Sequence, residues 1–142
     1  MRTSALVALV VCAAGLGLAA QEEKGAVGKS RVFEMRTYHA AEGKVDALHA
    51  RFRMHTGKLF EKHGMTNIGY WVPIDQATGK ATTNRLVYIL AYPNAEARQA
   101  AWKAFQADPE WQKVKADSEV NGRLVERVDS VFLSATDYSP IE

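Results

Sequence analysis

The chain has 142 residues, of which 47% are apolar, and its 18 Lys and Arg side chains nearly balance 16 Asp and Glu. This length fits one domain with a single hydrophobic core, so we expect no second domain. No block of basic residues stands out, which argues against nucleic acid as a partner.

The first 20 residues resemble an export signal. Arg2 precedes an apolar run that continues to Ala20, and charged residues follow. The alternative is a retained membrane anchor, but the run is short for a membrane span and rich in Ala and Gly. We therefore interpret residues 1–20 as a cleaved signal peptide, which predicts a periplasmic or secreted protein with no stable membrane span after cleavage.

The only cysteine, Cys12, lies inside this apolar run. After cleavage the mature chain would have no thiol, which excludes disulfides, thiolate catalysis and cysteine-ligated metal sites. Residues 21–30 are mostly polar, with too few apolar side chains to offset the entropy of ordering them. We expect a flexible leader there, followed by one domain over residues 31–140.

Alternating side chains predict a first strand over residues 31–38. One of its faces would be apolar, and the other would carry the carboxylate of Glu34, the guanidinium of Arg36 and the phenol of Tyr38. The pattern then changes to a period of 3.6 residues, which predicts an amphipathic helix over residues 44–63.

Alternation returns over residues 66–74, where Pro73 confines the end of this second strand to a sheet edge or a bulge. The third strand, residues 85–92, is apolar on both faces. We expect the helices to cover one face and to leave the other open. The side chains expected on the open face are Leu86, Tyr88, Leu90 and Tyr92.

An open apolar face on the third strand predicts a partner. Soluble monomers rarely expose so large an apolar patch, and the rest of the chain is too small to cover it. We therefore expect a homodimer in which two copies pack sheet to sheet about a two-fold axis.

Two further helices and a last strand complete the chain. Asn94 is a suitable N-cap for a helix over residues 95–107, and Asp108 followed by Pro109 suits the start of a shorter one. Residues 124–133 would form the last strand. The order β-α-β-β-α-β is that of the split βαβ or ferredoxin-like fold, an α+β arrangement with one antiparallel sheet and its helices on one face.

Several short motifs carry a resemblance to a known family. They are V-F-E-M-R-T-Y at residues 32–38 with Gly43 soon after, H-G-M-T-N-I-G-Y-W at 63–71, V-Y-I-L-A-Y at 87–92, Arg98, and D-P-E-W at 108–111. Their order and spacing resemble the NIPSNAP family, of the dimeric α+β barrel superfamily, over nearly all of residues 32–140.

This resemblance implies a homodimer whose facing sheets form a barrel, the same assembly that the open face predicts. It implies little about activity. Eukaryotic relatives are associated with mitochondria and vesicle trafficking, and because this chain carries an export-type leader we do not transfer those roles to it.

Glu34 and Arg36 share a strand face and can pair. The two interpretations are a structural ion pair and an Arg36 that binds or polarises an anion. The ligand-binding candidates combine this pair with aromatic side chains: Glu34, Arg36, Tyr38, Trp71 and Tyr88. If the protein is an enzyme, the catalytic candidates are Arg36, Tyr38 and His39.

The histidines do not suggest a metal site. His55 and His63 would lie about 12 Å apart along the predicted helix, and no histidine pair has the i, i+4 spacing of a zinc motif. The sequence also has no nucleophile elbow and no phosphate-binding glycine loop. We therefore expect no metal and no cofactor.

Three functions fit these features. The one we favour is a non-catalytic homodimer that binds a small apolar or anionic molecule in the barrel cavity. The second is a cofactor-independent oxygenase or isomerase, as in relatives elsewhere in the superfamily, with Arg36, Tyr38 or His39 polarising or deprotonating the substrate. The third is a protein-interaction module that acts through its outer helices.

Overall fold

A computed structural model describes residues 31–81 and 84–141, so the predicted signal peptide and leader lie outside the described residues. Four strands form one antiparallel sheet in the order β2-β3-β1-β4. The elements in chain order are β1 (Val32–Ala40), α1 (Val45–Arg51), the π-helical turn η1 (Phe52–Thr56), α2 (Gly57–Lys62), β2 (Thr66–Trp71), β3 (Arg85–Tyr92), α3 (Ala95–Ala107), α4 (Pro109–Ser118) and β4 (Val125–Ser134).

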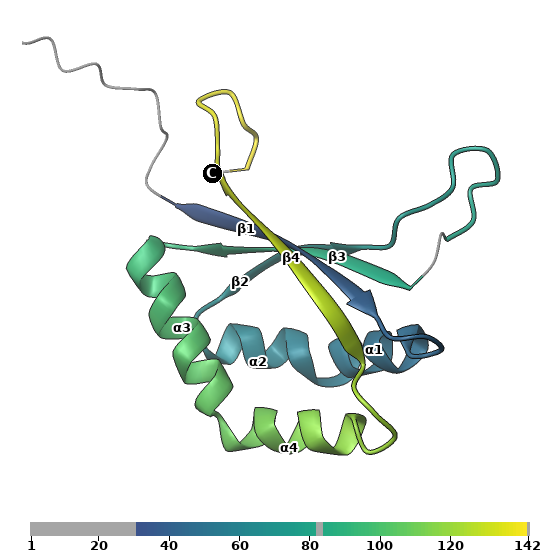
Figure 1. Ribbon diagram of the computed structural model, residues 1–142. Coiled ribbons are helices and arrows are strands. Elements are labelled where there is room, and N and C mark those ends of the chain that lie inside the picture. The colour runs from purple at the N-terminus through teal and green to yellow at the C-terminus, as the bar shows by residue number, and fades with distance from the viewer. Residues whose placement is uncertain (1–30, 82–83, 142) are drawn as a thin grey trace, which may run out of the picture.

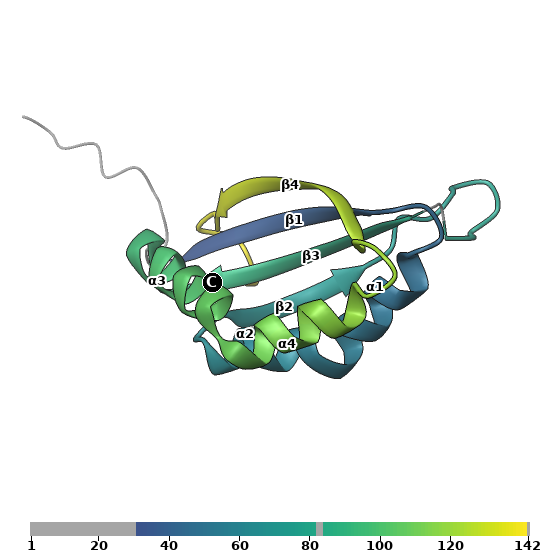
Figure 2. The ribbon, with the colours of Figure 1, turned by 60° about the horizontal axis from the view of Figure 1, so that its bottom comes forward.

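The helices lie on one side of the sheet and leave its other side open (Figure 1). Turning the molecule brings α3 and α4 in front of the strands and shows α1 and α2 on the same side (Figure 2). The predicted ferredoxin-like α+β class is therefore confirmed. Among the described residues, no helix is both long enough and apolar enough to span a membrane.

The predicted facing of β3 is wrong. The side chains expected on its open face lie under the helices, and all four are at most 2% exposed: Leu86, Tyr88, Leu90 and Tyr92. Val87 and Ile89 point the other way and are half-buried. A strand that is apolar on both faces does not reveal which face meets the helices, and here the larger side chains fill the core.

The predicted helix over residues 44–63 contains a π-turn at its centre. The Gly57 N–H donates to the Phe52 carbonyl, five residues back, instead of four. The buried Thr56 hydroxyl donates to the Arg51 carbonyl at 3.3 Å and thereby satisfies an acceptor of the wider turn. The turn inserts one residue into the helix and so rotates the side chains of α2 about the helix axis.

Strand β2 is three residues shorter than predicted and bulged. Its register with β3 shifts between Asn67 and Gly69, and it ends at Trp71, two residues before Pro73. The Trp71 ring lies over Gly69, where an added Cβ would be 2.7 Å from the indole. A glycine is therefore required at this position for the indole to lie flat on the open face.

Both predicted helix starts on the C-terminal side are confirmed. The Asn94 side chain accepts a hydrogen bond from the Ala97 N–H at 2.8 Å, and Asp108 accepts one from the Glu110 N–H at 2.8 Å with Pro109 in the first turn. These caps fix where α3 begins and thus which of its side chains meet the sheet.

Removal of the Asn94 cap tests that role. We expect Asn94→Ala to lower the free energy of unfolding by about 1 kcal/mol, because the first turn of α3 loses an acceptor for its free N–H groups. Urea denaturation measures the change. Gln99→Ala, an exposed substitution in the middle of the same helix, is the control, and an equal loss in both variants would contradict the capping role.

Candidate functional site

A fully buried carboxylate, Glu34, lies between β1 and α3. It accepts hydrogen bonds from Arg36 Nη1 at 2.6 Å, Arg98 Nη2 at 2.8 Å and Arg98 Nε at 3.0 Å. The Tyr92 hydroxyl at 3.0 Å and the Trp102 indole N–H at 3.2 Å complete its shell. The predicted pairing of Glu34 with Arg36 is confirmed, but Arg36 is only one of four partners.

The sequence places these partners by simple periodicity. Arg98 and Trp102 are one helical turn apart on α3 and so share the face that meets the sheet. Sequence reasoning did not assign Arg98 to Glu34. The available signal was an arginine one turn before a tryptophan expected to be buried, since a cation on a buried helix face requires a carboxylate.

The arginines reverse the effect of burial on the Glu34 pKa. Burial alone would raise the pKa of the carboxyl, but the hydrogen bonds and positive charges of Arg98 and Arg36 outweigh it and lower the pKa from 4.5 to about 2. Glu34 is therefore ionised at neutral pH, so it has no proton to donate as a general acid, and its low pKa makes it a weak base.

Arg36 has hydrogen-bonding capacity to spare. Its Nη1 is engaged by Glu34, while its buried Nε–H finds no hydrogen-bond partner among the described residues. The guanidinium lies 4.5 Å from the centre of the Trp102 ring and 5.7 Å from that of Tyr38, as in cation–π contacts. About 14% of the side chain is exposed, and it lines a surface cleft.

This cleft has a volume of about 460 Å³ and opens between the sheet and helices α3 and α4. Its wall combines aromatic rings with amide and ammonium groups. The main contributors are Arg36, Tyr38, Trp102, Gln106, Trp111 and Lys115. A cleft of this size and composition can hold a small molecule with an apolar body and an anionic group.

Tyr88 lies beneath Tyr38, with the two ring centres 5.2 Å apart. Its hydroxyl is buried beside Tyr38 and Arg36 but makes no hydrogen bond of good geometry within the described part of the chain. Burial, followed by the proximity of Tyr38, raises its pKa well above 10, so the phenol stays protonated. The Tyr88 O–H and the Arg36 Nε–H are thus two buried polar groups without a hydrogen-bonding partner.

The structure separates the predicted site residues into two sets. Glu34, Arg36, Tyr38 and Tyr88 all lie on the helix-covered face, as their pairing across β1 and β3 requires. The remaining two predicted residues point to the open face: Trp71 and His39.

His39 belongs to a polar cluster of its own. Its Nε2 lies 2.8 Å from Asp129 Oδ2 and 2.9 Å from Arg127 Nη2. His39 therefore does not join Arg36 and Tyr38 as a catalytic group. Within residues 31–81 and 84–141, no group of three or more His, Cys, Asp or Glu side chains could hold a metal ion.

A model of the NIPSNAP family matches residues 33–140. The fold is similar to that of an uncharacterized NIPSNAP domain protein from Burkholderia xenovorans, with 27% identity, 77% of this chain and 98% of that chain covered, and a TM-score of 0.62. A NIPSNAP family protein of unknown function from Agrobacterium tumefaciens gives 19% identity, coverage of 81% and 96%, and a TM-score of 0.65.

One similar structure belongs to a protein with a stated activity. SnoaB, a cofactor-independent oxygenase from Streptomyces nogalater, has 14% identity, coverage of 78% of this chain and 98% of that chain, and a TM-score of 0.50. At this identity the likeness shows the fold alone. No curated protein matches the chain in sequence.

The Glu34 network predicts a loss of stability in acid. A carboxyl whose pKa is 4.5 in the unfolded chain and about 2 in the folded protein contributes about 3 kcal/mol at neutral pH. Because the folded pKa is the lower one, this contribution is lost as the pH falls from about 4.5 to about 2. Urea melts across this pH range measure the loss.

Glu34→Gln should lower the free energy of unfolding at pH 7 by about 3 kcal/mol, since the two half-buried guanidiniums of Arg36 and Arg98 lose their counter-charge. It should also remove the part of the stability loss in acid that protonation of Glu34 causes. Glu126→Gln, at an exposed position on β4, is the matched control. A Glu34→Gln protein as stable at pH 7 as this control would refute the network's role.

Proposed function

The chain belongs to the NIPSNAP family, and we propose that it is an exported homodimer that binds a small anionic molecule in the cleft beside Arg36 of each subunit. The predicted site was the barrel cavity between two sheets. Because Arg36, Tyr38 and Tyr88 lie on the helix-covered face, the proposal moves the ligand to the helix side of the sheet. Export is proposed from the signal-like pattern of residues 1–20.

The observation that carries the proposal is the charge imbalance of the buried cluster. One carboxylate, Glu34, faces two guanidiniums, and Arg98 already binds it with two nitrogens. Arg36 is the cation with unused donors and an exposed edge in the cleft. Two guanidiniums thus face one carboxylate, and the positive charge that Glu34 does not neutralise remains to attract an anionic ligand.

The two polar groups without partners indicate where the anionic group would lie. Both groups are enclosed in the free protein and Tyr88 does not line the cleft, so side chains beside Arg36 must move aside before a ligand oxygen can accept from the Nε–H and the phenol O–H. The rings of Trp102 and Trp111 would contact the rest of the molecule. We therefore propose a ligand with a carboxylate or similar oxyanion on an apolar or aromatic body.

The open face of the sheet supports the homodimer. Trp71, Val131 and Leu133 are each 41–49% exposed there, and Val87 and Ile89 lie half-buried between them. No helix lies over this face (Figure 1), and residues 134–141 line only the part of it next to Ile89 and Leu133. A second copy packed sheet to sheet would bury this face and leave the cleft beside Arg36 accessible on the helix side.

Catalysis in the same cleft is the second candidate. SnoaB, which has the same fold, is a cofactor-independent oxygenase. In this chain Arg36 and Tyr88 present donors that would stabilise an oxyanion of a bound substrate. His39 lies on the other face, and Glu34 is a weak base whose oxygens are enclosed by its four partners, so the described cleft offers no side chain suited to be a general base near pH 7. This favours binding over turnover.

Binding of 1-naphthoate tests the site. Trp102 and Trp111 line the cleft, so their fluorescence reports occupancy. We expect Arg36→Met to weaken naphthoate binding at least tenfold, because a charge-assisted hydrogen bond is worth about 1.5–3 kcal/mol. Binding of the neutral 1-naphthalenemethanol should change little. Arg98 still pairs with Glu34 in this variant, so the fold is retained.

Arg123→Met makes the same chemical change at an exposed position outside the cleft and should bind naphthoate as the unmodified protein does. If Arg36→Met and Arg123→Met bind naphthoate equally well, Arg36 has a structural role and does not bind the ligand. Dioxygen consumption with bound substrate analogues would instead support the oxygenase.

A charge on the open face tests the dimer. Val131 is 46% exposed in one subunit, so Val131→Arg leaves the subunit fold intact but places a charge in the proposed interface. We expect light scattering at micromolar concentration to show a dimer for the unmodified protein and a folded monomer for this variant. Val120→Arg, at a position 79% exposed after α4, should remain dimeric. An unmodified protein that is monomeric would overturn the assembly.

A further inference from the structure

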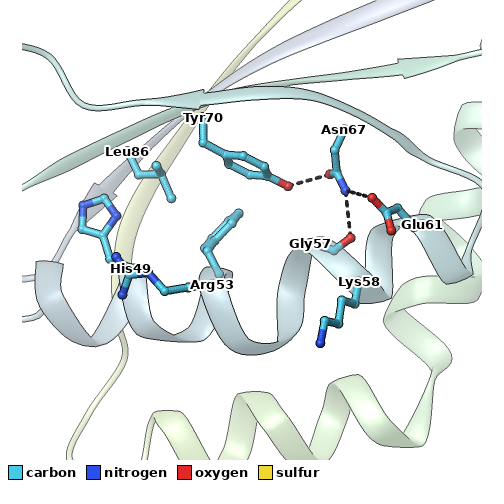
Figure 3. Close-up of a pocket in the computed structure, with 9 residues that line it drawn as sticks. His49, Arg53, Gly57, Lys58, Glu61, Asn67, Tyr70 and Leu86 are labelled. Atoms are coloured by element: carbon cyan, nitrogen blue, oxygen red, sulfur yellow. Dashed lines mark hydrogen bonds between the residues drawn. The ribbon is translucent and has the colours of Figure 1, made fainter.

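A second hollow, with a volume of about 400 Å³, lies between the N-terminal helical segments and the edge strand β2. Figure 3 shows His49 and Arg53 at one end of it, the hydrogen-bonded Asn67 and Glu61 at the other, and Tyr70 between them. It is separate from the cleft beside Arg36, because Phe52 and Tyr88 pack between the two.

The π-turn builds the helical wall of this hollow. Six helical residues line it: His49, Phe52, Arg53, Gly57, Lys58 and Glu61. Counted from His49 they are i, i+3, i+4, i+8, i+9 and i+12, whereas one face of a regular helix has i, i+3, i+4, i+7, i+8 and i+11. The inserted residue of the turn accounts for the difference. Without it these side chains would not share one face.

This wall is kept at the expense of helix stability. The π-turn and a glycine inside the helix are both unfavourable locally, and π-turns occur frequently at functional sites. At Gly57 an added Cβ would lie 3.4 Å from the Tyr70 hydroxyl, at van der Waals contact, so a larger residue would fill the space beside the phenol. Asn67 then links strand to helix, donating to the Gly57 carbonyl at 2.9 Å and to Glu61 at 3.0 Å.

The hollow has an aromatic floor and two ends of opposite polarity. The Phe52 and Tyr70 rings lie 5.8 Å apart. The basic side chains of His49 and Arg53 have no hydrogen-bond or ion-pair partner in the part of the chain that the structure describes. At the other end Asn67 uses one Glu61 oxygen and the Tyr70 hydroxyl donates to Asn67, which leaves acceptors on Glu61 and Tyr70.

Tyr70 keeps its proton at this site. Burial, and then the charge of Glu61, raises its pKa to about 12. Its hydroxyl therefore continues to donate to Asn67 at neutral pH and offers its oxygen to a ligand as an acceptor.

We propose that this hollow is a binding site for a planar aromatic acid that carries a hydroxyl or amino group at its far end. The carboxylate binds Arg53, the ring lies against Phe52 and Tyr70, and the distal donor binds Glu61. Arg53 and Glu61 are eight residues apart on the helix, about 12 Å along its axis, which suits a bicyclic ligand better than a single ring. The site is independent of the one beside Arg36.

The probe 6-hydroxy-2-naphthoate carries a carboxylate and a hydroxyl at opposite ends of a bicyclic ring. Its titration into the ¹⁵N-labelled full-length protein should shift the side-chain amide resonances of Asn67, whose nitrogen joins β2 to the helical wall of the hollow. We expect Arg53→Met to weaken binding about tenfold, whereas Arg36→Met should leave the Asn67 shifts and the affinity at this site unchanged. Arg123→Met is the matched control for the loss of an arginine.

Two further variants separate a binding role from a structural one. Gly57→Ala removes a helix-interior glycine and should not reduce thermal stability, yet its methyl group narrows the hollow beside Tyr70 and should weaken binding at least fivefold. Glu61→Gln keeps the oxygen that accepts from Asn67 and should abolish the preference for 6-hydroxy-2-naphthoate over 2-naphthoate. The proposal would be overturned if the probe did not shift the Asn67 resonances. It would also be overturned if Arg53→Met and Gly57→Ala both bound the probe as tightly as Arg123→Met does.

Discussion

The structure depends on the hydrogen-bonded carboxylate of Glu34, which is buried between β1 and α3. A carboxylate without water is stable only when its hydrogen bonds are all supplied, and two arginines, a tyrosine and a tryptophan supply them. The network joins the central strands to the helix layer. It also determines the site, because Arg36 has its position fixed by Glu34 while retaining donors of its own.

Local sequence signals predicted the helices and strands well. They predicted less well which face of each element packs against the rest of the fold. Asn94 and the Asp108–Pro109 pair mark two helix starts because capping depends only on adjacent residues. The facing of β3 could not be predicted, since both faces are apolar and the decision lies in how large side chains fill the core. The expected barrel-cavity site rested on the same choice of face, and the pairing of Arg98 with Glu34 was missed because it joins segments distant in sequence.

The two faces of the sheet have different proposed roles. In our proposals the helix-covered face holds ligands in two hollows, and the open face joins two copies. Alternation along β1 separates these tasks at the level of single residues, with Arg36 pointing to one side and Thr37 to the other. A change on the open face therefore reaches the ligand sites only through the backbone of the strands.

The Tyr88 hydroxyl shows where folding and function make opposite demands. A phenylalanine at this position would bury the same ring between Tyr38 and Phe60 without leaving an unsatisfied hydroxyl, which typically reduces stability by about 1–3 kcal/mol. Folding stability alone thus opposes the tyrosine. The cost of burying this hydroxyl is offset only when another atom accepts its hydrogen bond, so the free protein keeps a donor in place for a ligand that has yet to bind.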